Sequence, residues 1–161
     1  MKKEHLFILL LFVSALGLLS SCSSTKPLAD GQYMLVRNNV EVVDEKNPDF
    51  DNLKSYVRPI PNKKFMDVFS IKTMCYSAGQ PTFYKEGKLK DSKFRRLLRD
   101  RWGEHPVLLD STEIESSMVQ LNTVMSQLGY FDADMSFQVL PRKTNPKKVK
   151  VNYTTYASNE D

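Results

Sequence analysis

The side chains best suited to chemistry in this chain of 161 residues are its two cysteines and two histidines. His105 follows Glu104 and could act as a base, but no serine or cysteine is recognisable as the nucleophile that it would activate. Cys75 is typical of a small buried apolar side chain. So few cysteines and histidines exclude a disulfide framework and make a zinc site improbable. We therefore expect a protein that is not an enzyme and that holds no metal or cofactor.

Cys22 stands in a different sequence context, at the end of an apolar run. Residues 6–19 are almost all apolar and follow a lysine pair. This run is shorter than the roughly 20 residues that span a bilayer, and it suits the apolar region of a signal peptide. The residues before Cys22 resemble a bacterial lipobox, in which the cysteine thiol receives a diacylglyceryl group. The expected recognition residues for the signal peptidase are Leu19, Ser20 and Ser21.

Residues 1–21 are accordingly predicted to be a lipoprotein signal peptide, and Cys22 is predicted to be lipidated. Ordinary secretory cleavage beside an incidental cysteine is the alternative. Residues 22–32 contain Ser, Thr, Pro and Gly without a helical period, which indicates a lipidated tether. Two or more acyl chains hold a protein firmly on a membrane. No acidic residue lies between Cys22 and Asp30, and resemblance to lipoprotein sorting rules favours the outer membrane, on its periplasmic face.

Helices are predicted from apolar periodicity and capping residues. The clearest covers residues 111–128, because Asp110 and Glu113 have capping-box spacing and apolar residues recur every three or four positions. A short helix beginning at Asp49 or Asp51 places Phe50, Leu53 and Val57 on one face. Two further helices are predicted over residues 63–76 and over residues 92–102, the second with Phe94, Leu97, Leu98 and Trp102 inward; residues 77–90 are predicted to be a loop.

Three strands are predicted from β-forming residues and alternation. Residues 33–43 are rich in β-formers, with a bend or bulge at Asn38-Asn39, and residues 131–139 and 149–154 alternate apolar with polar side chains. The last two should form a hairpin around a polar turn at residues 141–148. A three-stranded sheet needs one covered face, and the helices from residues 49 and 111 can supply it. We expect an α+β fold with a three-stranded mixed sheet and helices on one face.

This strand-helix-helix-strand-strand order resembles a POTRA domain, the periplasmic module of the BamA/TamA family of outer-membrane assembly proteins. The likeness is greatest to the amino-terminal region of the TamL-type lipoproteins of Bacteroidota, without the barrel that follows in that family. It implies a POTRA-like domain over residues 33–157, with a loop insertion around residues 63–106 and a C-terminal tail at 158–161. The segments that carry it are the lipobox, Leu35–Val40, Tyr56–Asn62, Arg101–Val107 and Leu128–Ala133.

The resemblance also implies a docking surface. A sheet edge offers unpaired N–H and C=O groups to which another extended chain can add. In POTRA domains the strand after the long helix is usually that edge, so the expected partners are nascent outer-membrane proteins or assembly subunits. The candidate edge residues are Phe131, Asp132, Ala133, Asp134, Met135, Ser136 and Phe137.

Charge distribution supplies an alternative. The net charge of +4 is too small to indicate nucleic-acid binding, which export also argues against. Residues 58–101 nevertheless hold 12 basic and 4 acidic residues. The second hypothesis is an anchored adaptor lipoprotein that contacts lipid headgroups without binding clients, and the third is a periplasmic enzyme that uses His105. The candidate basic face consists of Arg95, Arg96, Arg99 and Arg101.

Overall fold

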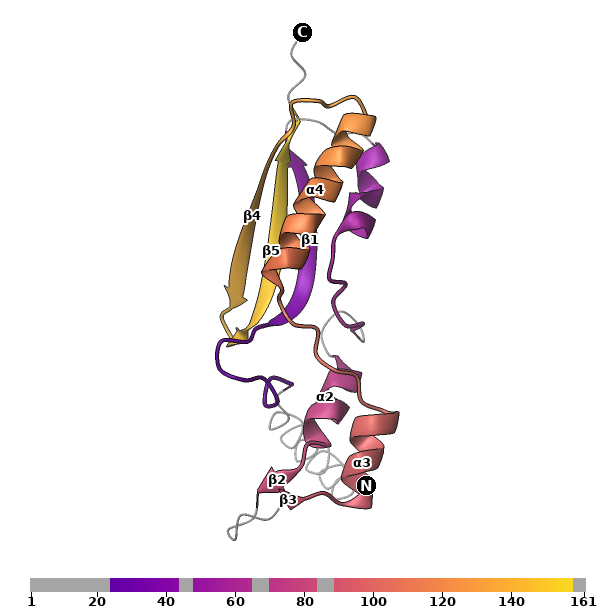
Figure 1. Ribbon diagram of the computed structural model, residues 1–161, viewed down its shortest axis with the longest axis vertical. Coiled ribbons are helices and arrows are strands. Elements are labelled where there is room, and N and C mark those ends of the chain that lie inside the picture. Colours follow the sequence, from indigo (N-terminus) through magenta and orange to yellow (C-terminus); the bar gives the residue numbers. More distant parts are fainter. Residues whose placement is uncertain (1–23, 44–47, 65–69, 84–88, 158–161) are drawn as a thin grey trace, which may run out of the picture. The chain divides into compact units, whose positions relative to one another are not determined.

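The computed structural model describes residues 24–43, 48–64, 70–83 and 89–157 (Figure 1). The predicted signal peptide, Cys22 and the tail at 158–161 lie outside the described residues, as does part of the helix expected over 63–76. The chain divides into two compact units. We call Leu28–Lys63 together with Pro106–Asp161 the sheet unit, and Met1–Pro27 together with Lys64–His105 the insert unit.

The sheet unit contains a three-stranded mixed sheet, which confirms the predicted α+β class. Its strands are β1 (Met34–Val43), β4 (Asp134–Arg142) and β5 (Asn145–Tyr156), and β5 lies in the centre. The first strand runs parallel to β5, and β4 runs antiparallel to it. The hairpin is tighter than expected, because the strands extend through most of residues 141–148 and leave Lys143-Thr144 as the turn.

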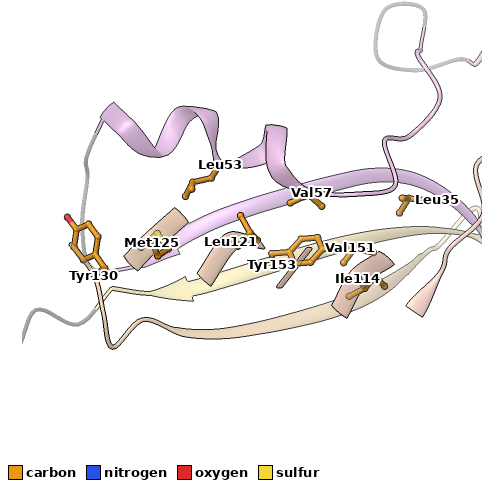
Figure 2. Close-up of a cluster of buried hydrophobic side chains, with 9 residues drawn as sticks. All are labelled: Leu35, Leu53, Val57, Ile114, Leu121, Met125, Tyr130, Val151 and Tyr153. Carbon is orange, nitrogen blue, oxygen red and sulfur yellow. The ribbon is translucent and has the colours of Figure 1, made fainter. Parts of the chain in front are cut away.

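One face of the sheet is covered by two helices (Figure 1). These are η1 (Pro48–Tyr56), a 3-10 helix, and α4 (Ser111–Gln127). The Asp110 carboxylate caps α4 by accepting a hydrogen bond from the amide of Thr112 at 2.8 Å. Figure 2 shows the apolar side chains between helices and sheet, which come from β1, η1, α4 and β5 and from the segments that directly follow η1 and α4. This core consists of Leu35, Leu53, Val57, Ile114, Leu121, Met125, Tyr130, Val151 and Tyr153.

The junction between α4 and β4 differs from the prediction. Gly129 adopts a φ of +99°, which glycine tolerates without strain, and Tyr130 then turns into the core beside Phe50. The strand begins at Asp134 rather than at Phe131, and Phe131 is 77% exposed. The alternating pattern therefore wrongly placed Phe131 in the strand. The turn that buries Tyr130 directs the next side chain, that of Phe131, toward solvent. In β1, the irregularity lies between Leu35 and Arg37 rather than at Asn38-Asn39.

The insert unit is folded where a loop insertion was expected. It contains α2 (Ile71–Ala78), the short strands β2 (Thr82–Phe83) and β3 (Leu89–Lys90), α3 (Lys93–Arg96) and the π-helical turn η2 (Leu97–Arg101). The Ser92 hydroxyl caps α3 by accepting a hydrogen bond from the amide of Arg95. Gly79 allows α2 and η2 to touch, since a Cβ at that position would lie 2.6 Å from the backbone nitrogen of Arg99.

This backbone contact explains a second correction. Phe94, Leu97 and Trp102 were predicted to point inward, but all three are exposed. The close approach at Gly79 brings Arg95 and Arg99, both partly buried, to the side of α3–η2 that faces α2, and Phe94, Leu97 and Trp102 stay exposed.

The described part of the expected tether is packed. Ser24 and Thr25 are buried, and residues 24–27 form a turn. Leu28, which belongs to the sheet unit, clusters with Met34 and Val36. Only a short stretch around Gly31 therefore fits the expected description of exposed connecting chain, and Lys147 binds Asp30 there at 3.4 Å.

Candidate functional site

The strand β4 forms one edge of the three-stranded sheet. It pairs with β5 on one side, and no other strand of the described residues pairs with it. The stretch Met135–Leu140 contains neither a charged residue nor proline, although charges and prolines are the usual devices that protect an edge from strand addition. Phe137 is 45% exposed and Leu140 is also exposed. This edge therefore has the composition of a surface that accepts another strand.

The two faces of β4 differ in polarity. Met135, Phe137 and Val139 stand opposite Thr155, Tyr153 and Val151, on the face that the helices cover. Ser136 and Gln138 stand opposite Thr154 and Asn152, on the other face. An added strand would continue both rows, so the edge should prefer a segment that alternates apolar with polar side chains.

The opposite edge of the sheet is partly occupied. The amide of Leu35 donates to the carbonyl of Val107 at 2.8 Å, and the amide of Leu109 donates to the carbonyl of Tyr33 at 2.8 Å. Met34 and Leu108 form an antiparallel bridge between these bonds. The beginning of β1 is thereby closed to an incoming strand, which leaves β4 as the more accessible edge.

The candidate edge residues are thus divided by the structure. Asp134, Met135, Ser136 and Phe137 lie on β4, whereas Phe131, Asp132 and Ala133 lie in the turn before it. The edge also continues further than predicted, to Arg142. Its later residues were missed because Pro141 was taken to end the strand, although proline is compatible with an edge strand.

The segment Tyr56–Asn62, which carried part of the family resemblance, is held by buried polar side chains. The hydroxyl of Ser117 accepts from the amide of Arg58 at 2.8 Å. Asn38 donates from Nδ2 to the carbonyl of Pro59 at 2.9 Å, and Asn62 accepts from the amide of Val107 at 2.8 Å. Beside this segment lies an open cavity of about 350 Å³, lined by Asn38, Lys54, Ser55, Val57, Arg58, Ile60 and Pro61.

Two buried polar atoms near this segment have no hydrogen-bond partner of good geometry within the described part of the chain. They are Oδ1 of Asn38 and the hydroxyl of Tyr153. Burial raises the pKa of Tyr153, and the neighbouring Ser117 hydroxyl partly offsets that rise. Unsatisfied buried groups of this kind cost roughly 1–3 kcal/mol each, so this part of the core is polar at the expense of stability.

The four arginines of the candidate basic face do not share one environment. Arg95 donates to the carbonyl of Gln80 at 2.9 Å. Arg99 binds Asp100 at 2.8 Å and Asp91 at 3.4 Å, and its hydrogen bond to Asp100 raises the pKa of Arg99. Both of these side chains are partly buried, whereas Arg96 and Arg101 are exposed.

The other sequence candidates are not brought together. The ring of His105 lies 4.1 Å from the ring of Tyr76 between centroids, and Cys75 is a half-buried free thiol on α2. The lipobox residues Leu19, Ser20, Ser21 and Cys22 lie outside the described residues. Within the described ranges, no group of three or more metal-ligating side chains occurs. No helix in those ranges has the length and apolar character needed to cross a membrane.

Comparison with known proteins found no matching family model and no matching curated protein.

Proposed function

We propose that this chain is a lipid-anchored periplasmic module of POTRA type that supports outer-membrane protein assembly. In this proposal Cys22 carries the lipid and residues 1–21 are the signal peptide. The module binds extended segments of nascent outer-membrane proteins or partner subunits along β4. It acts by binding and not by catalysis, and it requires no cofactor.

The observation that carries the proposal is the free, uncharged edge of β4. Strand addition gains affinity from main-chain hydrogen bonds, while side-chain pockets at alternate positions supply selectivity. Phe137 and Val139 offer an apolar row on one face, and Ser136 and Gln138 offer a polar row on the other. Strands of outer-membrane barrels alternate apolar with polar residues in the same way. The chemistry of the edge therefore matches that class of client.

An NMR titration of the mature chain with a ten-residue alternating peptide tests the proposal. We expect the amide shifts to change along Met135–Leu140, and the change should saturate. The same peptide with two central prolines is the control, because it loses the N–H groups that pair with an edge. The substitution Ser136→Lys should weaken binding by roughly tenfold, since a lysine on an edge strand opposes strand addition.

Lys150→Glu is the matched variant on the central strand, and it should leave affinity within about twofold because β5 already pairs on both sides. The proposal is wrong if the alternating peptide and its proline version bind equally. It is also wrong if the shifts fall on β1 and spare β4. Crosslinking in cells from position 137 should then identify outer-membrane barrel proteins, and crosslinking from Val119, exposed on α4, should not.

A further inference from the structure

The insert unit buries no large apolar side chain among its described residues, since every buried large apolar residue belongs to the sheet unit. Five of its large apolar side chains are instead exposed. Exposed apolar groups gathered in one small unit mark an interaction site more often than chance. These residues are Ile71 (52% exposed), Leu89 (58%), Phe94 (64%), Leu97 (39%) and Trp102 (55%).

Three of the five, Phe94, Leu97 and Trp102, lie on or directly after the short helical segment formed by α3 and η2. Phe94, Leu97 and Arg101 are spaced at i, i+3 and i+7, and all are exposed, so they share one side of α3–η2. Arg95 and Arg99 alternate with them and are partly buried. The exposed side of this segment therefore carries Phe94 and Leu97 beside charged side chains, whereas a helix that packs on a core turns its apolar residues inward.

The charges of this segment are mainly positive. Lys93, Arg96 and Arg101 are exposed beside Phe94 and Leu97. Asp91 pairs with Arg99 and Arg96, and Asp100 pairs with Arg99, so residues 91–102, with five basic and two acidic residues, keep a net positive charge. We call the set Lys93, Phe94, Arg96, Leu97, Arg101 and Trp102 the apolar-basic face.

We propose that the apolar-basic face docks on the surface of a bilayer that contains anionic phospholipid. Aromatic side chains, tryptophan above all, favour the boundary between headgroups and acyl chains. Surrounding lysines and arginines gain energy from anionic headgroups. A protein partner would need acidic groups to match the cations and an apolar pocket for each aromatic ring, whereas a membrane surface offers both everywhere along its plane.

The position of the proposed lipidation site, Cys22, agrees with docking on a membrane. Ser24 and Thr25 are buried and are grouped with the insert unit, and the sequence places Cys22 two residues before Ser24. Lipidation at Cys22 would therefore keep the chain that leads into this unit at the membrane. Docking does not depend on β4, so its failure would leave the proposed strand binding untouched.

Trp102 is the single tryptophan of the chain and stands within the face. Its emission therefore reports docking directly. The experiment uses the chain from residue 22 with Cys22→Ser, so that no acyl chain contributes, and vesicles with or without phosphatidylglycerol. We expect a blue shift of Trp102 emission and co-flotation with the anionic vesicles. Brominated lipid should quench Trp102, and binding should weaken as salt rises.

Variants separate the apolar and the basic contributions. Phe94→Ser with Leu97→Ser should lower the partition coefficient at least about tenfold. Lys93→Glu with Arg101→Glu should lower it at least about tenfold, since each cation contributes roughly fivefold. The matched controls lie on the sheet unit. They are Val119→Ser and Lys150→Glu, and they should stay within about twofold.

Three results would overturn the proposal. The first is Trp102 emission that does not change with anionic vesicles. The second is equal binding to purely zwitterionic vesicles. The third is a blue shift that grows with protein concentration in the absence of lipid, which would identify a second copy of the chain as the occupant. Circular dichroism of each variant checks that these exposed substitutions leave the fold intact.

Discussion

Leu121 and Met125 of the sheet unit are fully buried between helices and sheet, whereas Phe94 and Trp102 of the insert unit expose more than half of their surface. The sheet unit is thus held together by apolar burial. The insert unit is held by the approach of two backbones at Gly79, by capping at Ser92 and by the ion pairs of Arg99. A unit with so little buried apolar surface gains little stability from the hydrophobic effect, and its apolar side chains remain available to contact something else.

The difference between the two units is tested most directly by shortening one apolar side chain in each unit. Leu121→Ala should lower the free energy of unfolding by about 2–5 kcal/mol, because it leaves a cavity in a core with 0% exposure at that residue. Phe94→Ala should change it by less than about 0.5 kcal/mol. Urea denaturation followed by far-UV circular dichroism measures both. Similar losses at the two positions would contradict the comparison.

The backbone contact of the insert unit is tested by Gly79→Ala. The new Cβ would meet the backbone of Arg99 at 2.6 Å, and a backbone clash cannot be relieved by rotating a side chain. We expect a loss of about 1–3 kcal/mol, seen as faster hydrogen exchange in α2 and η2 with unchanged protection in β5. Ala78→Ser, at the exposed neighbouring residue, is the control and should leave exchange unaltered.

The smallest expected effect concerns the polar part of the sheet-unit core. Burial raises the pKa of Tyr153 above its usual value of 10.0, so the folded state favours the neutral phenol. The contribution of the neutral Tyr153 phenol to the free energy of unfolding is fully present below about pH 10. This contribution is lost as the pH rises through the raised pKa of Tyr153. Tyr153→Phe should therefore remove this alkaline loss, and it should raise stability near pH 7 by about 1 kcal/mol, since the hydroxyl that it removes is buried without a well-aligned partner.

Thermal denaturation at several pH values between 7 and 11 measures this difference. Tyr156→Phe, on the same strand but exposed, is the control and should keep the alkaline loss of the unmodified chain. An unchanged pH dependence in Tyr153→Phe would show that the loss arises elsewhere. Lys148 does not cause such a loss. Burial lowers the pKa of Lys148, so its contribution to stability increases as the pH rises toward 10.5.

The sequence predicted the parts of the fold that depend on local pattern. The helix α4 and its inward residues Ile114, Leu121 and Met125 follow from periodicity, and its ends follow from Asp110 and Gly129. The hairpin of β4 and β5 follows from the alternation of apolar and polar residues on either side of a polar turn. These features could be predicted because each is determined by residues within a few positions of one another.

The remaining features depend on contacts between distant residues. Nothing near Arg58 in the sequence shows that Ser117, 59 positions away, holds its amide. The closure of β1 by Val107–Leu109 depends likewise on a distant segment. In the insert unit, the rule that apolar residues face inward failed at Phe94 and Trp102 because Gly79, rather than an apolar side chain, forms the contact. The sequence indicated that the strand after α4 is an edge strand. It did not show that the turn at Phe131 delays the start of this strand to Asp134.

The central position of β5 has a consequence for when the binding edge comes into existence. Both outer strands hydrogen-bond to β5 and not to each other, and β5 is the latest of the three in the sequence. A chain that has been made or delivered only as far as β4 holds two strands that have no template. If clients add to β4 as we propose, the edge that receives them is incomplete until Tyr156 has been delivered, so a partly delivered chain should bind no client.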